Sequence, residues 1–390
     1  MTRNGPNQLA DLRYGAIAFS ALLVVTASSI AAPKPPARNV APQVALAKPA
    51  KLELVDVPIQ ELPGRLNEQF FVNVFLDVAA LEKAKIPTDK KVSLSAQYKS
   101  LDEGLTALTE AAGLAWLMRG EVIVLTSPDR FGEILDPRVY QLALPAQQAD
   151  YDKLIDSVVK VSPKSWSEDG GTGAVHELAP DLLIILQSPL VQKQLGKQFA
   201  STMRAVDHVD AKNPKPNWPV QTRALARPVS CDFEKKPLAE AIAALARDAK
   251  LPLALDDDEL KAAGVDAATR VSLRLRAVKL STVLNLLLEP LELTYLPAKQ
   301  GLRVTSMSAA ENDVSTVIYP VGDLLLTQYS GEELTRVVES SIVPTSWADV
   351  GGAGKLKLQA DQGMLEVSQY FDAHRQLEQL LADIRAARGR

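Results

Sequence analysis

The chain has 390 residues, of which 47% are hydrophobic and 23% charged, and 43 Lys and Arg against 47 Asp and Glu give a net charge of −4. This composition is that of a globular protein, so a chain disordered throughout, a collagen and a polytopic membrane protein are excluded. No basic field of the whole molecule is present to attract nucleic acid. One cysteine, Cys231, excludes an intramolecular disulfide and a multi-cysteine metal site.

Residues 1–32 have the pattern of a signal peptide or a membrane anchor. Arg3 and Arg13 precede an uncharged run over 14–32, with a strongly apolar centre and an end rich in small residues. This order is typical of a secretory signal peptide, with a cleavage point near Ala31. The run of 19 residues is also long enough to span a bilayer core of about 30 Å. Both alternatives place the rest of the chain in the periplasm or cell envelope, either released or anchored to the inner membrane by residues 14–32.

Two proline-rich stretches separate the predicted folded regions. Residues 33–50 contain five prolines in eighteen positions, which favours an extended polyproline-type spacer. Residues 207–228 contain four prolines, and we expect them to form a linker.

The regions on either side of the second linker repeat one pattern. Between residues 57 and 108, a set of residues recurs 179 positions later at one unbroken offset, as in the pair Pro58 and Pro237. Further along, the motif P-x-S-W-x-x-x-G-G-x-G occurs at 163–173 and again at 344–354. The sequence therefore predicts two tandem copies of one unit.

Hydrophobic periodicity divides each copy into two parts and predicts an α+β fold for both. The first part, over 51–128 and 229–308, has the predicted order β-α-β-β-α-β-β, with a small helix after the second strand. The second part, over 138–206 and 315–388, has the order β-α-β-β-α. Pro63 falls in the first helix of the first copy, so that helix is expected to start late or to kink.

The first parts resemble the short domain shared by the N-termini of secretins and TonB-dependent receptors, present here in two tandem copies. The matching residues in the second copy include a strand with Phe233, the run PLAEAIAAL at 237–245, VSLRL at 271–275 and LSTVLNLLL at 280–288. The resemblance covers about 155 of 390 residues and rests on a hydrophobic pattern. It implies a periplasmic interaction module. We expect neither a secretin pore domain nor a TonB-type barrel in this chain.

The duplicated motif supplies the candidate functional residues. They are Trp166, Gly170, Gly171 and Gly173 in the first copy and Trp347, Gly351, Gly352 and Gly354 in the second. Tryptophan offers a large flat contact surface, and glycine permits positive φ and close backbone approach. These properties suit a loop that binds a ligand or partner. They also suit a structural turn with each tryptophan packed on a core, and duplication does not separate the two.

The sequence predicts no catalytic residue, no metal site and no cofactor. The acidic run at 256–259 lacks the spacing of a calcium loop and is expected to open a helix. Cys231 is expected in the core rather than as a nucleophile. His176 lacks the second histidine of a zinc motif. His374 is expected on the solvated surface of the last helix.

These observations predict a non-enzymatic, exported envelope protein that binds other proteins. Its expected partners are envelope proteins, among them secretion or outer-membrane transport components, bound by a strand added to an exposed sheet edge. Nucleic acid is not an expected partner, and membrane contact is expected only through the N-terminal segment. The alternative is a protein that binds cell-wall glycan or another ligand through the duplicated Trp-Gly loops.

Overall fold

The computed structural model describes residues 41–143, 148–178, 180–206, 220–325 and 329–388. Residues Asn39–Arg390 pack as one unit, distinct from Met1–Arg38. The predicted signal peptide or anchor over 1–32 lies outside the described residues, as does most of both proline-rich stretches. Within the described ranges, no helix combines the length and apolar character needed to cross a membrane.

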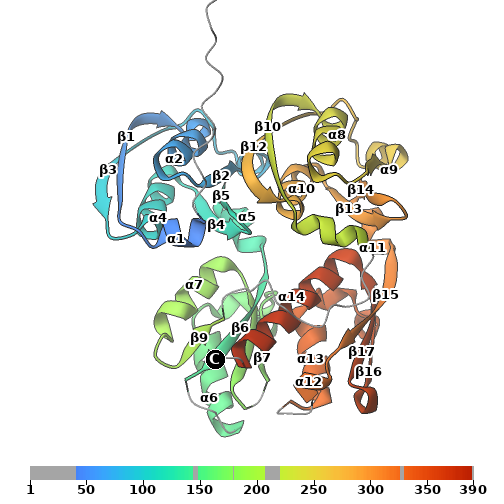
Figure 1. Cartoon of the computed structure of the whole chain (residues 1–390). Helices are drawn as coiled ribbons and strands as arrows, with labels where there is room; N and C mark the ends of the chain where they lie inside the picture. The colour runs from blue at the N-terminus through green and yellow to red at the C-terminus, as the bar shows by residue number, and fades with distance from the viewer. Residues whose placement is uncertain (1–40, 144–147, 179, 207–219, 326–328, 389–390) are drawn as a thin grey trace, which may run out of the picture. The chain divides into compact units, whose positions relative to one another are not determined.

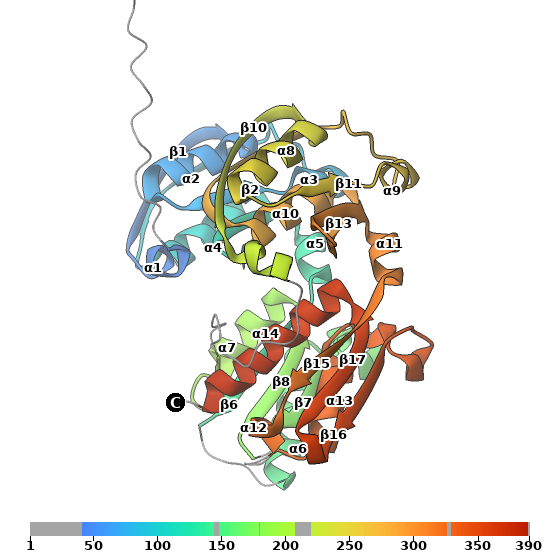
Figure 2. The ribbon, with the colours of Figure 1, turned by 45° about the vertical axis from the view of Figure 1, so that its right-hand side comes forward.

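The protein has the predicted α+β fold, built from small sheets (Figures 1 and 2). We divide it by its sheets into four regions. Domain 1 covers residues 50–133, module 1 covers 136–206, domain 2 covers 228–312 and module 2 covers 314–388.

Domain 1 combines an antiparallel pair, β1 with β3, and a three-stranded sheet in the order β2-β5-β4. β2 is parallel to β5, and β4 is antiparallel to it. The elements are β1 (Ala50–Pro58), η1 (Ile59–Glu61), α2 (Leu62–Phe70), β2 (Asn73–Leu76), α3 (Val78–Lys83), β3 (Lys91–Tyr98), α4 (Leu101–Ala112), β4 (Ala115–Arg119), β5 (Val122–Thr126) and α5 (Pro128–Glu133). Pro63 lies in the first turn of α2, where a missing N–H costs little, so the expected late start is confirmed.

Domain 2 has the same strand arrangement. β10 pairs with β12 antiparallel, and the second sheet has the order β11-β14-β13 with β11 parallel to β14. The elements are β10 (Pro228–Pro237), α8 (Leu238–Ala249), β11 (Leu253–Leu255), α9 (Asp257–Ala262), β12 (Arg270–Lys279), α10 (Leu280–Leu288), η5 (Glu289–Leu291), β13 (Leu293–Ala298), β14 (Gly301–Ser306) and α11 (Met307–Asn312).

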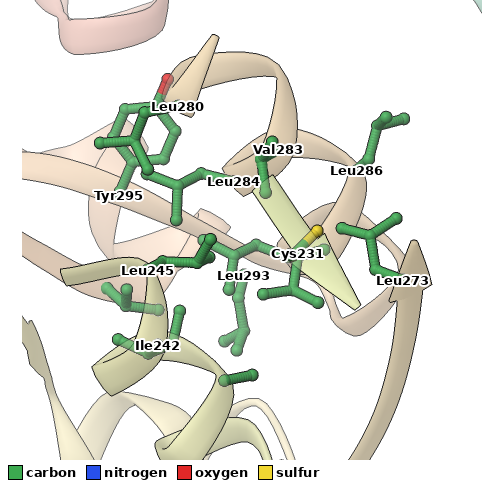
Figure 3. Close-up of a cluster of buried hydrophobic side chains, with 14 of the residues drawn as sticks. Cys231, Ile242, Leu245, Leu273, Leu280, Val283, Leu284, Leu286, Leu293 and Tyr295 are labelled. Atoms are coloured by element: carbon green, nitrogen blue, oxygen red, sulfur yellow. The ribbon is translucent and has the colours of Figure 1, made fainter. Parts of the chain in front are cut away.

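Cys231 lies in the hydrophobic interior of domain 2, as Figure 3 shows. Its neighbours in the cluster include Leu273 from β12 and Leu293 from β13. Burial raises the pKa of the thiol to about 11, so the sulfur is protonated and unreactive at neutral pH. The prediction that Cys231 is a core residue is confirmed.

The two modules are antiparallel sheets covered by helices. Module 1 has the strand order β7-β8-β6-β9, and module 2 has the order β15-β17-β16. Module 1 contains β6 (Asp136–Leu142), α6 (Gln148–Val159), η2 (Pro163–Ser165), η3 (Ser167–Asp169), β7 (Ala174–Leu178), β8 (Leu182–Gln187), α7 (Pro189–Gln198) and β9 (Met203–Ala205). Module 2 contains β15 (Val314–Pro320), α12 (Gly322–Leu325), α13 (Gly331–Ser341), η6 (Pro344–Ser346), η7 (Ala348–Val350), β16 (Lys355–Gln359), η8 (Ala360–Gln362), β17 (Met364–Tyr370) and α14 (Phe371–Arg388).

Both proline-rich stretches end earlier than expected. A short helix, α1 (Pro42–Leu46), forms within the predicted spacer over 33–50, and β1 begins before that spacer ends. Within the predicted linker over 207–228, the turn η4 (Val220–Ala226) adds buried residues to the core of domain 2. Proline in a first helical turn is compatible with a helix, but its contribution to the proline content predicted a linker there.

A cation lies over an aromatic ring in both halves and joins each domain to its module. Lys193 Nζ on α7 is 5.2 Å from the ring centroid of Trp116 on β4. Arg375 on α14 is 5.8 Å from the ring of Tyr295 on β13, and its Nη1 donates to the tyrosine hydroxyl at 2.5 Å. Such contacts contribute about 0.5–2 kcal/mol each.

Candidate functional site

The duplicated motif forms the same turn in both modules. The proline of each motif opens a 3-10 turn, η2 or η6, and a second 3-10 turn, η3 or η7, follows the tryptophan. The turn closes through a single β-bridge, from Trp166 to Gly173 in module 1 and from Trp347 to Gly354 in module 2.

Each glycine of the motif meets a backbone requirement. Gly170 has a φ of 85°, in the left-handed region that glycine favours. A Cβ on Gly171 would lie 2.3 Å from the carbonyl carbon of Ser165, and a Cβ on Gly173 would lie 2.1 Å from Nε2 of Gln187. Module 2 repeats these constraints at Gly351 (φ 90°), Gly352 and Gly354.

A buried glutamine that sequence reasoning missed holds each turn in place. Gln187, at the end of β8, donates from Nε2 to Ser165 Oγ at 2.8 Å, and its Oε1 accepts from the Ser188 N–H at 2.8 Å. Gln369, at the corresponding place on β17, donates to Ser346 Oγ at 2.5 Å. A glutamine follows the last glycine of both motifs at nearly equal spacing, so extending the motif along the chain would have found it.

Both tryptophans of the motif are core residues. Trp166 is 2% exposed and Trp347 is 3% exposed. Nε1 of Trp347 donates to the carbonyl of Ile342 at 2.8 Å, whereas Nε1 of Trp166 is buried without a hydrogen-bond partner among the described residues. Neither ring is available to stack on a sugar, so the glycan alternative loses its contact surface. The structural-turn alternative accounts for every residue of the motif.

The expectation that His374 is a solvated surface residue is wrong. His374 is fully buried, with Nδ1 2.9 Å from the Tyr319 hydroxyl and Nε2 2.9 Å from the Ser315 carbonyl oxygen. Burial lowers the pKa of its imidazole. Both partners lie on β15, so His374 is on the face of α14 that packs against the sheet of its own module. Helical spacing places Leu377 and Leu381 of the buried cluster on the same face. The helix also runs beside β6 of module 1 (Figure 2).

The remaining polar candidates have structural partners. Asp256 lies before α9 and accepts from the N–H of Glu259 at 3.5 Å, so the acidic run opens a helix as predicted. Glu259 in turn accepts from the Ser306 hydroxyl at 2.7 Å. Burial lowers the pKa of His176 on β7. In the described part of the chain, no three His, Cys, Asp or Glu side chains gather as metal ligands.

One sheet edge is bound by a side chain from elsewhere in the same protein. Asn73, at the start of β2, donates from Nδ2 to the Arg276 carbonyl at 3.0 Å and accepts at Oδ1 from the Arg276 N–H at 2.9 Å. Two bonds to the N–H and C=O of one residue reproduce a step of a β-ladder. A bulge in β12 permits them, since Ala277 has a φ of 50° and donates its N–H to Ser230 Oγ at 3.0 Å.

Among the residues that the structure describes, none makes such a contact with the corresponding edge in domain 1. Gln97 of β3 is 179 positions before Arg276, and it pairs with Lys51 of β1 without a bulge. Within the described ranges, β1 is the only strand that pairs with β3. The side chains of β3 that face solvent after Lys91 are Ser93, Ser95 and Gln97.

Other edges are guarded against strand addition. The solvent-facing residues of β12 include Arg270, Arg274 and Arg276. In module 2, β16 exposes Lys355 and Lys357. Charged side chains on an edge strand oppose pairing with another strand. The edge of β3 from Ser93 to Gln97 has no charged solvent-facing side chain, so it lacks this protection.

The chain matches no protein-family model and no curated protein. Among solved structures, it is similar to a chain of the GspC–GspD complex from the type II secretion system of enterotoxigenic Escherichia coli. The TM-score is 0.15 at 12% identity, and the alignment covers 41% of this chain and 99% of that chain. A likeness at this TM-score carries no argument, so function must be inferred from the residues and their geometry.

Proposed function

We propose that this protein is a non-enzymatic binding protein of the cell envelope that recognises another protein through the open edge of β3. The observation that carries the proposal is the contact between Asn73 and the backbone of Arg276, because it occupies the equivalent edge of domain 2. The edge of domain 1 is left for a partner. The predicted export segment over 14–32 and the resemblance to secretin and receptor N-terminal domains support an envelope location.

A partner strand on β3 would gain main-chain hydrogen bonds along the strand. Ser93, Ser95 and Gln97 are small or neutral side chains that neither repel a neighbouring strand nor shield the backbone. The equivalent positions of β12 are Ser272, Arg274 and Arg276, so two of the three carry charge in domain 2. This difference favours β3 over β12 as the strand that a partner extends.

The glycan alternative is not favoured, because the rings that it needs are buried. The proposal also asks for no bond-making chemistry. Cys231, the single thiol, has a pKa raised to about 11 by burial and is inert at neutral pH.

The test is capture of a partner from envelope extract by the tagged full chain and by the variant S95R/Q97R. The variant gives β3 the charges of β12 at positions that face solvent, so the fold is expected to survive. We expect the wild-type chain to retain a partner that the variant loses. The matched control is R274S, which removes a charge from β12 and should leave capture unchanged. Equal capture by wild type and S95R/Q97R would overturn the assignment to β3.

A further inference from the structure

A hollow of about 540 Å³ lies over the outer face of the sheet β2-β5-β4. Its floor is one row across that sheet, formed by Phe75, Val124 and Leu117, which are direct neighbours in the strand register. Helix α3 lines one wall with the small side chains of Ala79 and Ala80, and residues of domain 2 line the other. The volume is in the range of ligand-binding pockets.

Domain 2 does not repeat this apolar floor. The equivalent row of its sheet is Ala254, Arg303 and Leu296, in the same register. Where α3 has Ala79 and Ala80, α9 has Asp258 and Glu259. The apolar floor and the small side chains that open the space are therefore features of domain 1 and not of the shared strand arrangement.

The rim of the hollow has an excess of negative charge. Its three cations are in ion pairs: Arg119 with Glu289 at 2.5 Å, Arg130 with Glu133 at 3.6 Å and Lys83 with Glu133 at 4.0 Å. Two further rim carboxylates, Asp129 and Glu292, are exposed and have no cationic partner among the described residues.

We infer that this hollow binds a segment of a partner polypeptide in which an apolar side chain is flanked by lysine or arginine. The apolar side chain would lie on the row of Phe75, Val124 and Leu117. The flanking cation would pair with Asp129 or Glu292, which attract positive charge at the rim. The inference rests on the proposed function only in taking the ligand to be a protein.

The test uses the full chain, with methyl-labelled leucine and valine, and two probe peptides. These are acetyl-Ala-Leu-Lys-Leu-Lys-Ala-amide and its counterpart with glutamate in place of lysine. We expect the lysine peptide to shift the methyl resonances of Leu117 and Val124 in a saturable way that weakens with added salt. The glutamate peptide should not shift them. Equal binding of both peptides, or shifts confined to other methyl groups, would overturn the inference.

Two variants sharpen the test. D129N/E292Q should weaken binding of the lysine peptide about three- to tenfold, since exposed ion pairs contribute only modestly to affinity. A79L should abolish binding, because an exposed position of α3 would then fill the hollow. The matched control is D169N/D361N, at exposed acids outside the rim, which should leave the affinity unchanged. Unchanged affinity in both D129N/E292Q and A79L would contradict the site.

The outcomes separate this inference from the proposed function. Partner capture that depends on Ser95 and Gln97, without any peptide binding in the hollow, would leave the function standing and refute the hollow. Peptide binding that A79L abolishes, without any partner captured at β3, would support the hollow and count against the β3 proposal.

Discussion

Modules 1 and 2 share the arrangement of three strands, to which module 1 adds β9, but they differ in what their outer faces meet. All six residues of β8, the central strand of module 1, are buried. The corresponding strand β17 alternates between buried and more exposed residues. Val139, Ile184 and His176 form one row across the first sheet, and Ile318, Glu366 and Lys357 form the equivalent row across the second. The first face packs on the helices of module 2, and the second carries charge.

The two domains show the same contrast. Val124 at the centre of the domain 1 sheet is 5% exposed and joins the hydrophobic cluster of domain 2. Arg303 has the equivalent place in domain 2, with 43% of its side chain exposed and ion pairs to Asp256 and Asp313. In the modules and in the domains alike, the sheet with an apolar outer face is covered on that face by other parts of the protein. The sheet with a charged outer face is not. In the first half the central strands β5 and β8 are buried along their whole length, whereas the equivalent strands β14 and β17 of the second half are partly exposed at Arg303 and Glu366.

The largest expected effect comes from giving module 1 the residue of module 2. I184E would place a carboxylate between the first sheet and the hydrophobic side chains of the helices α13 and α14. An uncompensated buried charge should lower the free energy of unfolding by about 3–5 kcal/mol. Denaturant unfolding measures this loss. I184V, which keeps the face apolar, serves as the control and should cost much less; similar losses in both variants would mean that charge is not the cause.

The reverse exchange, E366I, should act on association rather than on folding. It would join Ile318 and Met364, which are 42% and 38% exposed, into a continuous apolar strip on the outer face of module 2. Exposed apolar strips of this kind drive association. Sedimentation should show a concentration-dependent dimer or higher species for E366I and not for E366Q. If E366I stays monomeric, the charge of Glu366 is not what prevents other structure from packing on this face.

A smaller effect is expected where the two domains meet. N73A would leave the part-buried N–H and C=O of Arg276 without their amide partner, at a cost of about 1 kcal/mol in the free energy of unfolding. P252N, which places asparagine at the equivalent position of domain 2, is the matched control, and no gain in the free energy of unfolding is expected from it. An unchanged unfolding midpoint for N73A would show that the contact does not help to hold the two domains together.

The smallest effect concerns pH and one buried pair in each module. Tyr319 bonds His374 in module 2, and Tyr140 donates to Gln192 Oε1 at 2.7 Å at the equivalent place in module 1. Burial lowers the pKa of His374 in the folded state, so below its ordinary value of about 6.5 the unfolded chain binds a proton that the folded chain does not. Its contribution to stability is therefore present above that pH and is lost as the pH falls.

The variant H374Q should remove this part of the pH dependence of stability. The variant Q192H should create a similar pH dependence in module 1. Unfolding free energies between pH 7.5 and about 5 measure the slope for each variant. His176 is also buried with a lowered pKa, so part of the slope will remain in H374Q. An identical slope in wild type and H374Q would mean that His374 does not titrate on unfolding in this range.

The sequence predicted what depends on local pattern. Hydrophobic periodicity was enough for the α+β class, because each helix and strand buries one side of itself whatever its neighbours are. The late start of α2 at Pro63 followed from the backbone chemistry of proline. The burial of Cys231 followed from the alternation of apolar and polar residues along its strand. The duplicated motif was found as well, although its residues left two alternatives open until the burial of Trp166 and Trp347 was known.

The features that the sequence analysis missed depend on contacts between distant parts of the chain. His374 is an exception, because it lies three and seven residues before Leu377 and Leu381. This helical spacing puts it on the leucine face and could have predicted its burial. Gln187 and Gln369 lie on strands and bind a turn more than ten residues away in the chain. The contact between Asn73 and Arg276 spans 203 residues and rests on a bulge that has no equivalent in domain 1.

The most direct test of the account is the rate at which a thiol reagent labels cysteines placed at equivalent positions of the two halves under native conditions. I184C probes the first half, E366C probes the second, and buried Cys231 is a slow internal reference. We predict that I184C reacts only as fast as the structure opens, while E366C reacts at the rate of an accessible thiol. Equal rates at Ile184 and Glu366 would contradict the claim that the first half is covered by the second.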